Sequence, residues 1–257
     1  MEGPQVHHYA RQLRPMAGWT LTDVAGERAA VFDGVRGFRF GTAFGYGKLL
    51  MIPIDAPEGD GEGRLIRIHC LMFGDVRIDD DRPGKRLTLE MNVRGRSSRQ
   101  THRVRVYLGA ARLASPDEID PAVRRRDVVA NDQPKPATIR DCVAVMPDAV
   151  VADALLDQDW FPGLGNKIRV EALFRSRIHP MRTMASLNDA EVKRLSKEIR
   201  AFTRHFVERI DEVGDRANLN YIAFRKRTCP NCDGAMVNQK VGELQRNVHY
   251  CETCQSA

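Results

Sequence analysis

Residues 163–180 decide the fold: they read Gly-Leu-Gly-Asn-Lys-Ile-Arg-Val-Glu-Ala-Leu-Phe-Arg-Ser-Arg-Ile-His-Pro. A glycine-rich turn opens this stretch, and apolar side chains then recur at helical spacing over residues 168–177. Residues 143–156, just upstream, carry the same spacing. Two helices separated by this turn are therefore predicted in the middle of the chain.

A longer helix is predicted directly downstream. Asn188 is followed three residues later by Glu191, which is a variant of the capping box that begins a helix, and the helix is expected to run to about Val213. Upstream, residues 115–137 contain four prolines and are expected to be a linker.

The first 114 residues are predicted to be mainly strands. A short helix is expected at the very start, because Pro4 suits a first helical turn and apolar residues follow at helical spacing. Alternation of apolar and polar residues then predicts strands over residues 29–32, 49–54, 65–69, 87–93 and 104–108. The acidic, glycine-rich residues 55–62 are expected to form a surface loop.

Four of the six cysteines form two tight pairs that can present four thiolates to one ion. These are Cys229, Cys232, Cys251 and Cys254. Four sulfur ligands leave no open position on the metal, so we expect a structural zinc. Two disulfides would need an oxidising compartment, for which there is no secretory signal. The lone Cys70 and Cys142 are expected to be buried.

Composition narrows the class of protein. The 257 residues are 42% hydrophobic and 29% charged, which excludes a disordered chain or a fibre. The sequence contains no membrane-length apolar run and no signal peptide, so we expect a cytoplasmic protein. Basic residues outnumber acidic ones eight to two over residues 81–106 and ten to four over residues 160–204. Such tracts are typical of nucleic-acid binding, although many basic stretches are only solvated faces.

The expected fold class is α+β: an N-terminal antiparallel β-sandwich, a helical domain and a C-terminal zinc hairpin. We place the domain boundaries at residues 1–130, 131–224 and 225–257.

Together these motifs resemble the Fpg/Nei superfamily, the formamidopyrimidine-DNA glycosylases and the endonuclease VIII enzymes. The resemblance is carried, in family order, by Glu2-Gly3-Pro4, Tyr46-Gly47-Lys48-Leu49-Leu50, residues 69–74, residues 163–180 and the four cysteines. It implies that the helical domain has a helix-two-turn-helix motif, and that the protein bends duplex DNA and flips out a nucleotide between its domains. It is nearer to the endonuclease VIII branch.

The resemblance implies that the N-terminal α-amine is the nucleophile and that Glu2 is a general acid/base. A lone Glu near a chain end would otherwise be only an exposed charge. The chain departs from the family pattern because no proline precedes Glu2. We expect Met1 to be retained and its amine to take the nucleophile position. Base excision is compatible with this change, whereas the Schiff base and the lyase step are left open.

Further site residues are implied by the same resemblance. Lys48 matches a phosphate-contacting lysine and is an alternative nucleophile. Met72, between Leu71 and Phe73, is the candidate wedge that fills the gap left by a flipped base, although Leu71 can also be read as a core residue of a strand. Asn166 is expected to cap a helix and contact phosphate.

Two arginines complete the expected DNA-binding set. Arg169 is expected to join the phosphate contacts, and Arg246 to reach DNA from the zinc hairpin. Elsewhere, residues 108–113 lack the family segment that probes the partner base, and only Arg112 is a possible relic of it.

We therefore predict a monomeric DNA glycosylase that acts on double-stranded DNA. We expect it to excise a damaged or modified base, preferentially a pyrimidine. Two alternatives stay open: an enzyme against bulky modified bases of invading phage DNA, and a catalytically inactive DNA-binding relative.

Overall fold

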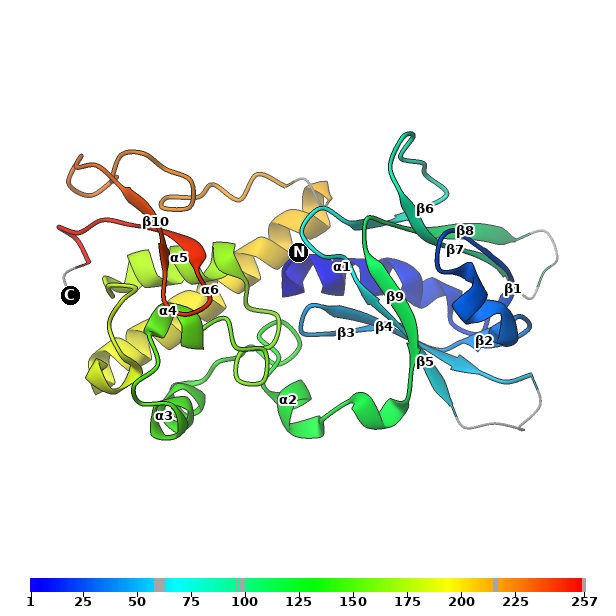
Figure 1. Ribbon diagram of the computed structural model, residues 1–257, viewed down its shortest axis with the longest axis horizontal. Helices are drawn as coiled ribbons and strands as arrows, with labels where there is room; N and C mark the ends of the chain where they lie inside the picture. The colour runs from blue at the N-terminus through cyan, green and yellow to red at the C-terminus, as the bar shows by residue number, and fades with distance from the viewer. Residues whose placement is uncertain (58–62, 96, 98–99, 215–216, 256–257) are drawn as a thin grey trace. The chain divides into compact units, whose positions relative to one another are not determined.

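The computed structural model describes residues 1–57, 63–95, 97, 100–214 and 217–255 (Figure 1). The chain divides into two compact units, one made of Met1 with Gln5–Asp120 and the other of Glu2–Pro4 with Pro121–Ala257. From residue 58 onward, the acidic loop expected over residues 55–62 lies outside the described residues. The described helices include none that is both long and apolar enough to cross a membrane.

The first unit is an antiparallel sheet. Its strands are β1 (Thr20–Ala25), β2 (Arg39–Phe40), β3 (Phe44–Tyr46), β4 (Leu49–Asp55), β5 (Arg64–His69), β6 (Asp75–Ile78), β7 (Leu87–Arg94), β8 (Thr101–Tyr107) and β9 (Ala110–Ala114). They pair in the order β6-β8-β7-β1-β2-β4-β5-β9, with β3 added to β4. Val76 and Val106 at one end of this path share a buried cluster with Ile66 and Ala111 at the other. Strands from both ends of the path therefore contribute to a common core, and the predicted antiparallel β-rich fold is confirmed.

Four of the five predicted strands coincide with β4, β5, β7 and β8. The strand expected over residues 29–32 is wrong, because this segment is the 3-10 helix η2 (Ala29–Val35). Phe32 and Val35 are both fully buried there, and their spacing of three suits a 3-10 turn, in which such side chains eclipse. Strands β1, β2, β3, β6 and β9 were not predicted. In β1 a register shift between Leu21 and Asp23 disrupts the alternation that marks a strand.

The helix expected at the N-terminus is confirmed as α1 (Gly3–Leu13), followed by the 3-10 turn η1 (Arg14–Met16). Val6, Ala10 and Leu13 are buried against the sheet core, as their helical spacing requires. The residues expected to be a linker contain the boundary between the units, but they also contain η3 (Pro116–Glu118) and α2 (Pro121–Arg125).

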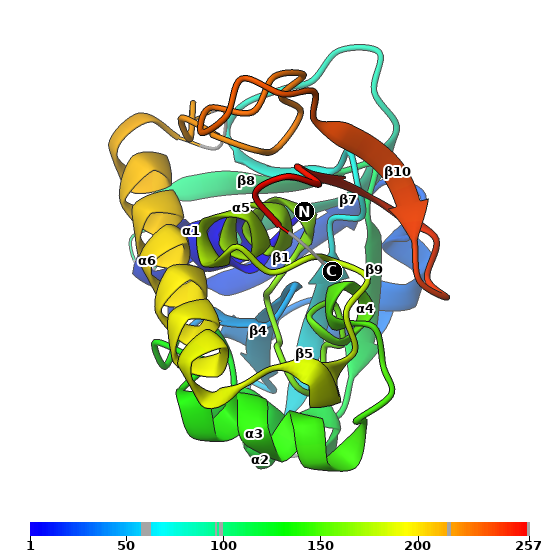
Figure 2. The same ribbon diagram turned by 90° about the vertical axis from the view of Figure 1, so that its left-hand side faces the viewer.

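The second unit is helical. Its further helices are α3 (Pro136–Val145), α4 (Val151–Ala154), α5 (Asn166–Ser176), η4 (Met184–Ser186) and α6 (Asp189–Val213). Figures 1 and 2 show α5 lying alongside the long α6, and buried Leu173 and Phe202 belong to their common core. The predicted capping box is confirmed: Asn188 Oδ1 accepts from the Glu191 N–H at 3.0 Å, and the Glu191 carboxylate accepts from the Asn188 N–H at 2.9 Å. Such a cap is worth about 1 kcal/mol.

The single helix predicted over residues 143–156 is wrong. Helix α3 ends at Val145, and α4 begins only at Val151. Pro147 lies between them, and a proline has no N–H to continue a helix. The chain therefore turns here instead of extending α3.

The C-terminal segment forms a hairpin of β10 (Val237–Val241) and β11 (Arg246–Tyr250). Val241 and Val248 are buried in the same cluster as the helices of the second unit, so the hairpin packs on that unit. The predicted burial of Cys70 and Cys142 is confirmed, and burial raises the pKa of each thiol to about 12.

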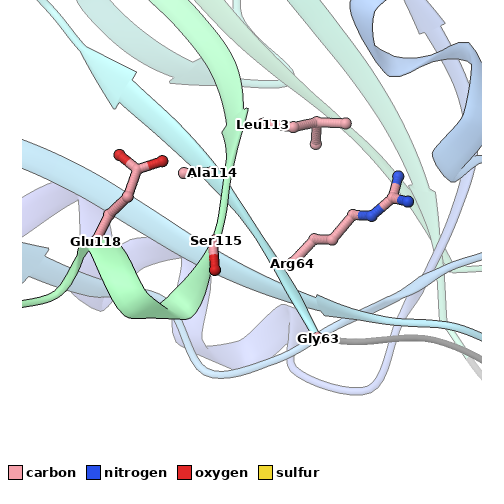
Figure 3. Close-up of a pocket in the computed structure, with 6 residues that line it drawn as sticks. All are labelled: Gly63, Arg64, Leu113, Ala114, Ser115 and Glu118. Carbon is pink, nitrogen blue, oxygen red and sulfur yellow. The ribbon is translucent and has the colours of Figure 1, made fainter.

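One surface depression of about 400 Å³ lies on the edge of the first unit's sheet (Figure 3). Its lining comes from the start of β5, the end of β9 and η3, namely Gly63, Arg64, Leu113, Ala114, Ser115 and Glu118. None of the site residues expected from the sequence lines this depression.

Candidate active site and nucleic-acid interface

The Glu2 carboxylate lies at the N-terminus of α5. Only 5% of Glu2 is exposed, and its carboxylate accepts hydrogen bonds from the backbone N–H of Lys167 at 2.6 Å and of Ile168 at 3.3 Å. The first N–H groups of a helix have no partner within the helix, and the helix dipole favours a negative charge at this end. Glu2 is therefore fixed in place as the side chain that caps α5.

Two glycines allow this close approach. The Gly3 N–H donates to the Gly163 carbonyl at 2.8 Å, which holds the N-terminal segment against the turn before α5. A Cβ on Gly165 would lie 2.3 Å from Cγ of Glu2, a distance that no side chain tolerates. The glycine-rich turn 163–165 therefore serves to admit Glu2.

The α-amine of Met1 is held in the first unit. It donates to the carbonyl of Leu71 at 2.5 Å. Leu71 has a φ of 48°, in the left-handed region that a leucine rarely adopts. Such unusual backbone conformations cost free energy and cluster at functional sites.

The amine is one of several positive charges that act on His69. The pKa of His69 is lowered by its burial, and further by the positive charges of the N-terminal amine, Arg67 and Lys48. Lys48 follows Gly47 in the tight turn of the hairpin formed by β3 and β4. This positive environment attracts anions such as phosphate.

The candidate wedge residues are exposed. Leu71, Met72 and Phe73 have 43%, 68% and 74% of their surface exposed, although each is a large apolar residue. The alternative reading of Leu71 as a core residue is therefore wrong. Three neighbouring exposed apolar side chains are expected at an interaction surface.

Asn166 is the first residue of α5 and is partly exposed, whereas Arg169, one turn later, has no exposed surface. The Arg169 guanidinium donates to Asn166 Oδ1 at 2.6 Å and to the carbonyls of Ala152 at 3.0 Å and Asn247 at 2.9 Å. The expectation that Arg169 contacts phosphate directly is corrected accordingly. Its guanidinium is buried and donates to groups of the protein itself.

Arg246 lies at the exposed start of β11. It pairs across the hairpin with Val241, next to the turn formed by residues 242–245. The hairpin expected between the two cysteine pairs thus places a cation at its tip.

The four cysteines come together in space. The ligand atoms of Cys229, Cys232, Cys251 and Cys254 all lie within 4.8 Å of one another. Two of the sulfur separations are 3.7 Å and 3.5 Å. Tetrahedral zinc with Zn–S bonds of about 2.3 Å requires sulfurs roughly 3.8 Å apart, so this donor set fits the ion.

Sequence reasoning missed three residues that shape these sites. His69 and Arg67 lie on β5 and contribute to the electrostatics around the amine. Asp153 of α4 accepts from the backbone of the hairpin turn. His69 begins a stretch that already resembled the family, whereas nothing in the sequence points to Asp153, because its partners lie about 90 residues away.

Comparison with known proteins agrees with this geometry. Residues 137–214 match the family model described as the formamidopyrimidine-DNA glycosylase H2TH domain. Over 106 residues the chain is 34% identical to Endonuclease 8-like 3 of Bos taurus, a match that covers 41% of this chain and 17% of that protein. Over 117 residues it is 35% identical to formamidopyrimidine-DNA glycosylase of Shouchella clausii, covering 41% and 42%. The matched region therefore spans less than half of these relatives.

Solved structures match over nearly the whole chain. A viral DNA glycosylase superimposes with a TM-score of 0.86 at 18% identity, covering 99% of this chain and all of that one. Lactococcus lactis Fpg in complex with DNA containing an abasic site gives a TM-score of 0.80 at 18% identity, with full coverage of both chains. The MutM (Fpg) protein of Thermus thermophilus gives 0.76 at 24% identity, covering 99% of this chain and 98% of that one. The helical domain therefore matches the H2TH domain of the formamidopyrimidine-DNA glycosylases, and the chain shares its fold with the solved Fpg structures.

Proposed function

We propose that the protein is a DNA glycosylase that excises a damaged or modified base. The observation that carries this proposal is the position of Glu2, a buried carboxylate fixed at the N-terminus of α5 and next along the chain to the α-amine. A general acid/base must be held in place close to the group it serves. An ordinary N-terminal Glu would be mobile and solvated.

The proposed chemistry uses the α-amine and the carboxyl group together. The Met1 nitrogen forms a bond to C1′ of the target nucleotide while the bond from C1′ to the base breaks, and the base leaves with the bonding electron pair. Glu2 in its acid form donates a proton to the ring oxygen O4′ as the C1′–O4′ bond breaks. One proton lost by the nitrogen neutralises the departing base, which leaves a protonated Schiff base between the nitrogen and C1′. An α-amine has a reference pKa of about 8, so a useful fraction is unprotonated near neutral pH.

We infer that the partner is double-stranded DNA and that the protein acts as a monomer. Lys48, Asn166 and Arg246 are proposed to contact phosphates, which position a duplex without reading its sequence. Met72 is proposed to occupy the gap left by the flipped base. Its exposure supports this role, because a wedge must be free of the core before DNA arrives.

We propose that the four-cysteine cluster holds a structural zinc ion. Four thiolates saturate a tetrahedral ion, so no position is left for water or substrate. The ion would fix the segments flanking the β10–β11 hairpin, and thereby the hairpin that carries Arg246.

The test is the mass of the base released from a panel of duplexes with oxidised pyrimidines, oxidised purines and bulky phage-type modified bases. We expect release of an oxidised or modified pyrimidine, because residues 108–113 lack the family's partner-base probe. Release only of bulky modified bases would favour the role in defence against phage. Binding without release from any duplex would refute the glycosylase and favour the inactive relative.

A further inference from the structure

The turn of the hairpin is tied to α4 by one side chain. The Asp153 carboxylate accepts from the Glu243 N–H at 2.6 Å and from the Leu244 N–H at 3.2 Å. Gly242, which precedes them, has a φ of 64°, and a Cβ there would lie 2.0 Å from Oδ2 of Asp153. A glycine is therefore required for the carboxylate to reach the turn.

The other side of the hairpin is tied to α5 by Arg169. Its Nη2 donates both to the Asn247 carbonyl and to Oδ1 of Asn166, while Nη1 donates to the Ala152 carbonyl. Since Oδ1 of Asn166 is engaged by the guanidinium, the opposite branch of the amide, Nδ2, points away from it. Within the part of the chain that the structure describes, no group accepts from Nδ2, so this donor is available to an external acceptor such as a phosphate oxygen.

The electrostatics agree with this arrangement. Burial lowers the pKa of Arg169 to about 10, and the charges of Asp153 and Glu2 oppose that shift, so the guanidinium is charged at neutral pH. The positive charge of Arg246 lowers the pKa of Arg169 further, which means that the two cations lie near each other. Residues 244 and 247, on either side of Arg246, are held by Asp153 and Arg169.

We propose that Arg169 and Asp153 are positioning residues for DNA binding. Together they hold the Asn166 amide and the hairpin tip bearing Arg246 in one fixed arrangement, so that the two groups engage the DNA backbone as a unit. This inference rests on the proposed function, in which Asn166 and Arg246 contact phosphate. A purely structural Arg169 would instead stabilise the second unit without coupling these two contacts.

The test is a double-mutant cycle between Arg169→Met and Arg246→Ala. Affinity for a duplex with a tetrahydrofuran abasic analogue is measured over a range of salt concentrations. We expect Arg169→Met to weaken binding about tenfold and to flatten the salt dependence, although Arg169 itself has no surface with which to touch DNA. Arg246→Ala should then cost much less in the Arg169→Met background than in the wild type.

Arg194→Met is the matched control, because Arg194 also lies in the second unit and donates to a backbone carbonyl, that of Ser176, at 2.8 Å. It should bind DNA like the wild type and show no coupling to Arg246. Melting temperature and zinc content report whether each variant is folded. Should Arg169→Met not fold, Asp153→Asn and Gly242→Ala loosen only the hairpin anchor and should give the same coupling.

Two results would overturn the inference: a folded Arg169→Met protein with wild-type affinity, or additive effects of the two substitutions in every background. Failure of the proposed function looks different. In that case Asn166→Ala and Arg246→Ala would leave DNA binding unchanged even in the otherwise wild-type protein.

Discussion

The carboxylate of Glu2 accepts the backbone N–H of Lys167 at 2.6 Å, although 165 positions separate the two residues along the chain. The N-terminus and α5 are thereby joined at the point where the helix dipole stabilises a negative charge. Glu2 is thus held in place by the same helix whose first residue, Asn166, is proposed to contact DNA.

Gly165→Ala should disable base release while leaving DNA binding largely intact. The added methyl group would overlap the Glu2 side chain and displace it from α5. General acid/base catalysis typically contributes about 100-fold or more, so we expect a loss of that order in single-turnover excision. Gly34→Ala is the control, because a Cβ there meets nothing within 4 Å. A Gly165→Ala protein with unchanged excision would show that the position of Glu2 is irrelevant.

Cys229→Ser, or removal of the metal with a chelator, should unfold the hairpin and abolish tight DNA binding while the first unit stays folded. The free energy of metal binding supplies the folding free energy of such a small segment. Hydrogen exchange resolved by peptide reports each unit separately, and Cys142→Ala, outside the cluster, should retain the metal. Less than about half a zinc ion per chain in carefully purified protein would count against this ligand set.

Lys48→Ala should weaken binding to all duplex sequences alike. Removing one phosphate contact is expected to reduce the slope of log affinity against log salt by about 0.9, without changing which base is released. Lys85→Ala removes an exposed charge elsewhere in the first unit and serves as the control. A changed base preference with an unaltered salt slope would assign Lys48 a different role.

His69 should make stability depend on pH below neutrality. Burial, the amine, Arg67 and Lys48 lower the pKa of His69, so the folded protein binds this proton less readily than the unfolded chain does. The contribution of neutral His69 to the free energy of unfolding is therefore complete above the pKa of about 6.5 that this histidine has in the unfolded chain. It is lost as the pH falls through the lower pKa that His69 has in the folded protein. His69→Gln should lose less melting temperature than the wild type between about pH 8 and pH 5. Equal losses would contradict this.

Borohydride reduction during turnover should trap a covalent adduct between protein and DNA, and peptide mapping should place it on Met1. The reason is that the Schiff base is proposed to form on the α-amine, which donates to the carbonyl of Leu71 in the structure. The mass of the N-terminal peptide also shows whether Met1 is retained. An adduct on Lys48 would show that Lys48, and not the α-amine, is the nucleophile. Base release without an adduct would indicate a monofunctional enzyme that uses water.

Local patterns predicted the elements whose determinants lie close together in the sequence. Helix α6 was predicted from Asn188 and Glu191, and α1 from the spacing after Pro4, because caps and periodicity are local. The segments that were wrong depend on tertiary context. Residues 29–32 have a strand-like composition but pack Phe32 and Val35 on one side of a 3-10 turn. The overlooked Pro147, by contrast, was visible in the sequence.

Only those site residues that belong to a recognisable sequence motif could be predicted. The four cysteines and Glu2 stand in recognisable positions, whereas the burial of Arg169 depends on carbonyl groups that lie 17 and 78 residues away. An arginine on the first turn of a helix after a glycine-rich loop is otherwise a reasonable phosphate ligand. Only the packing of α4 and the hairpin around it shows that its partners are internal.

Single-turnover base release by the wild type and by Glu2→Gln, each saturated with the same lesion duplex, tests the proposed catalytic role of Glu2 most directly. The substitution keeps the volume of the side chain but removes its acidic proton. We predict that release slows by about 100-fold or more, while DNA affinity changes by less than about threefold. Equal rates of release in the two proteins would contradict the assignment of Glu2 as the general acid/base.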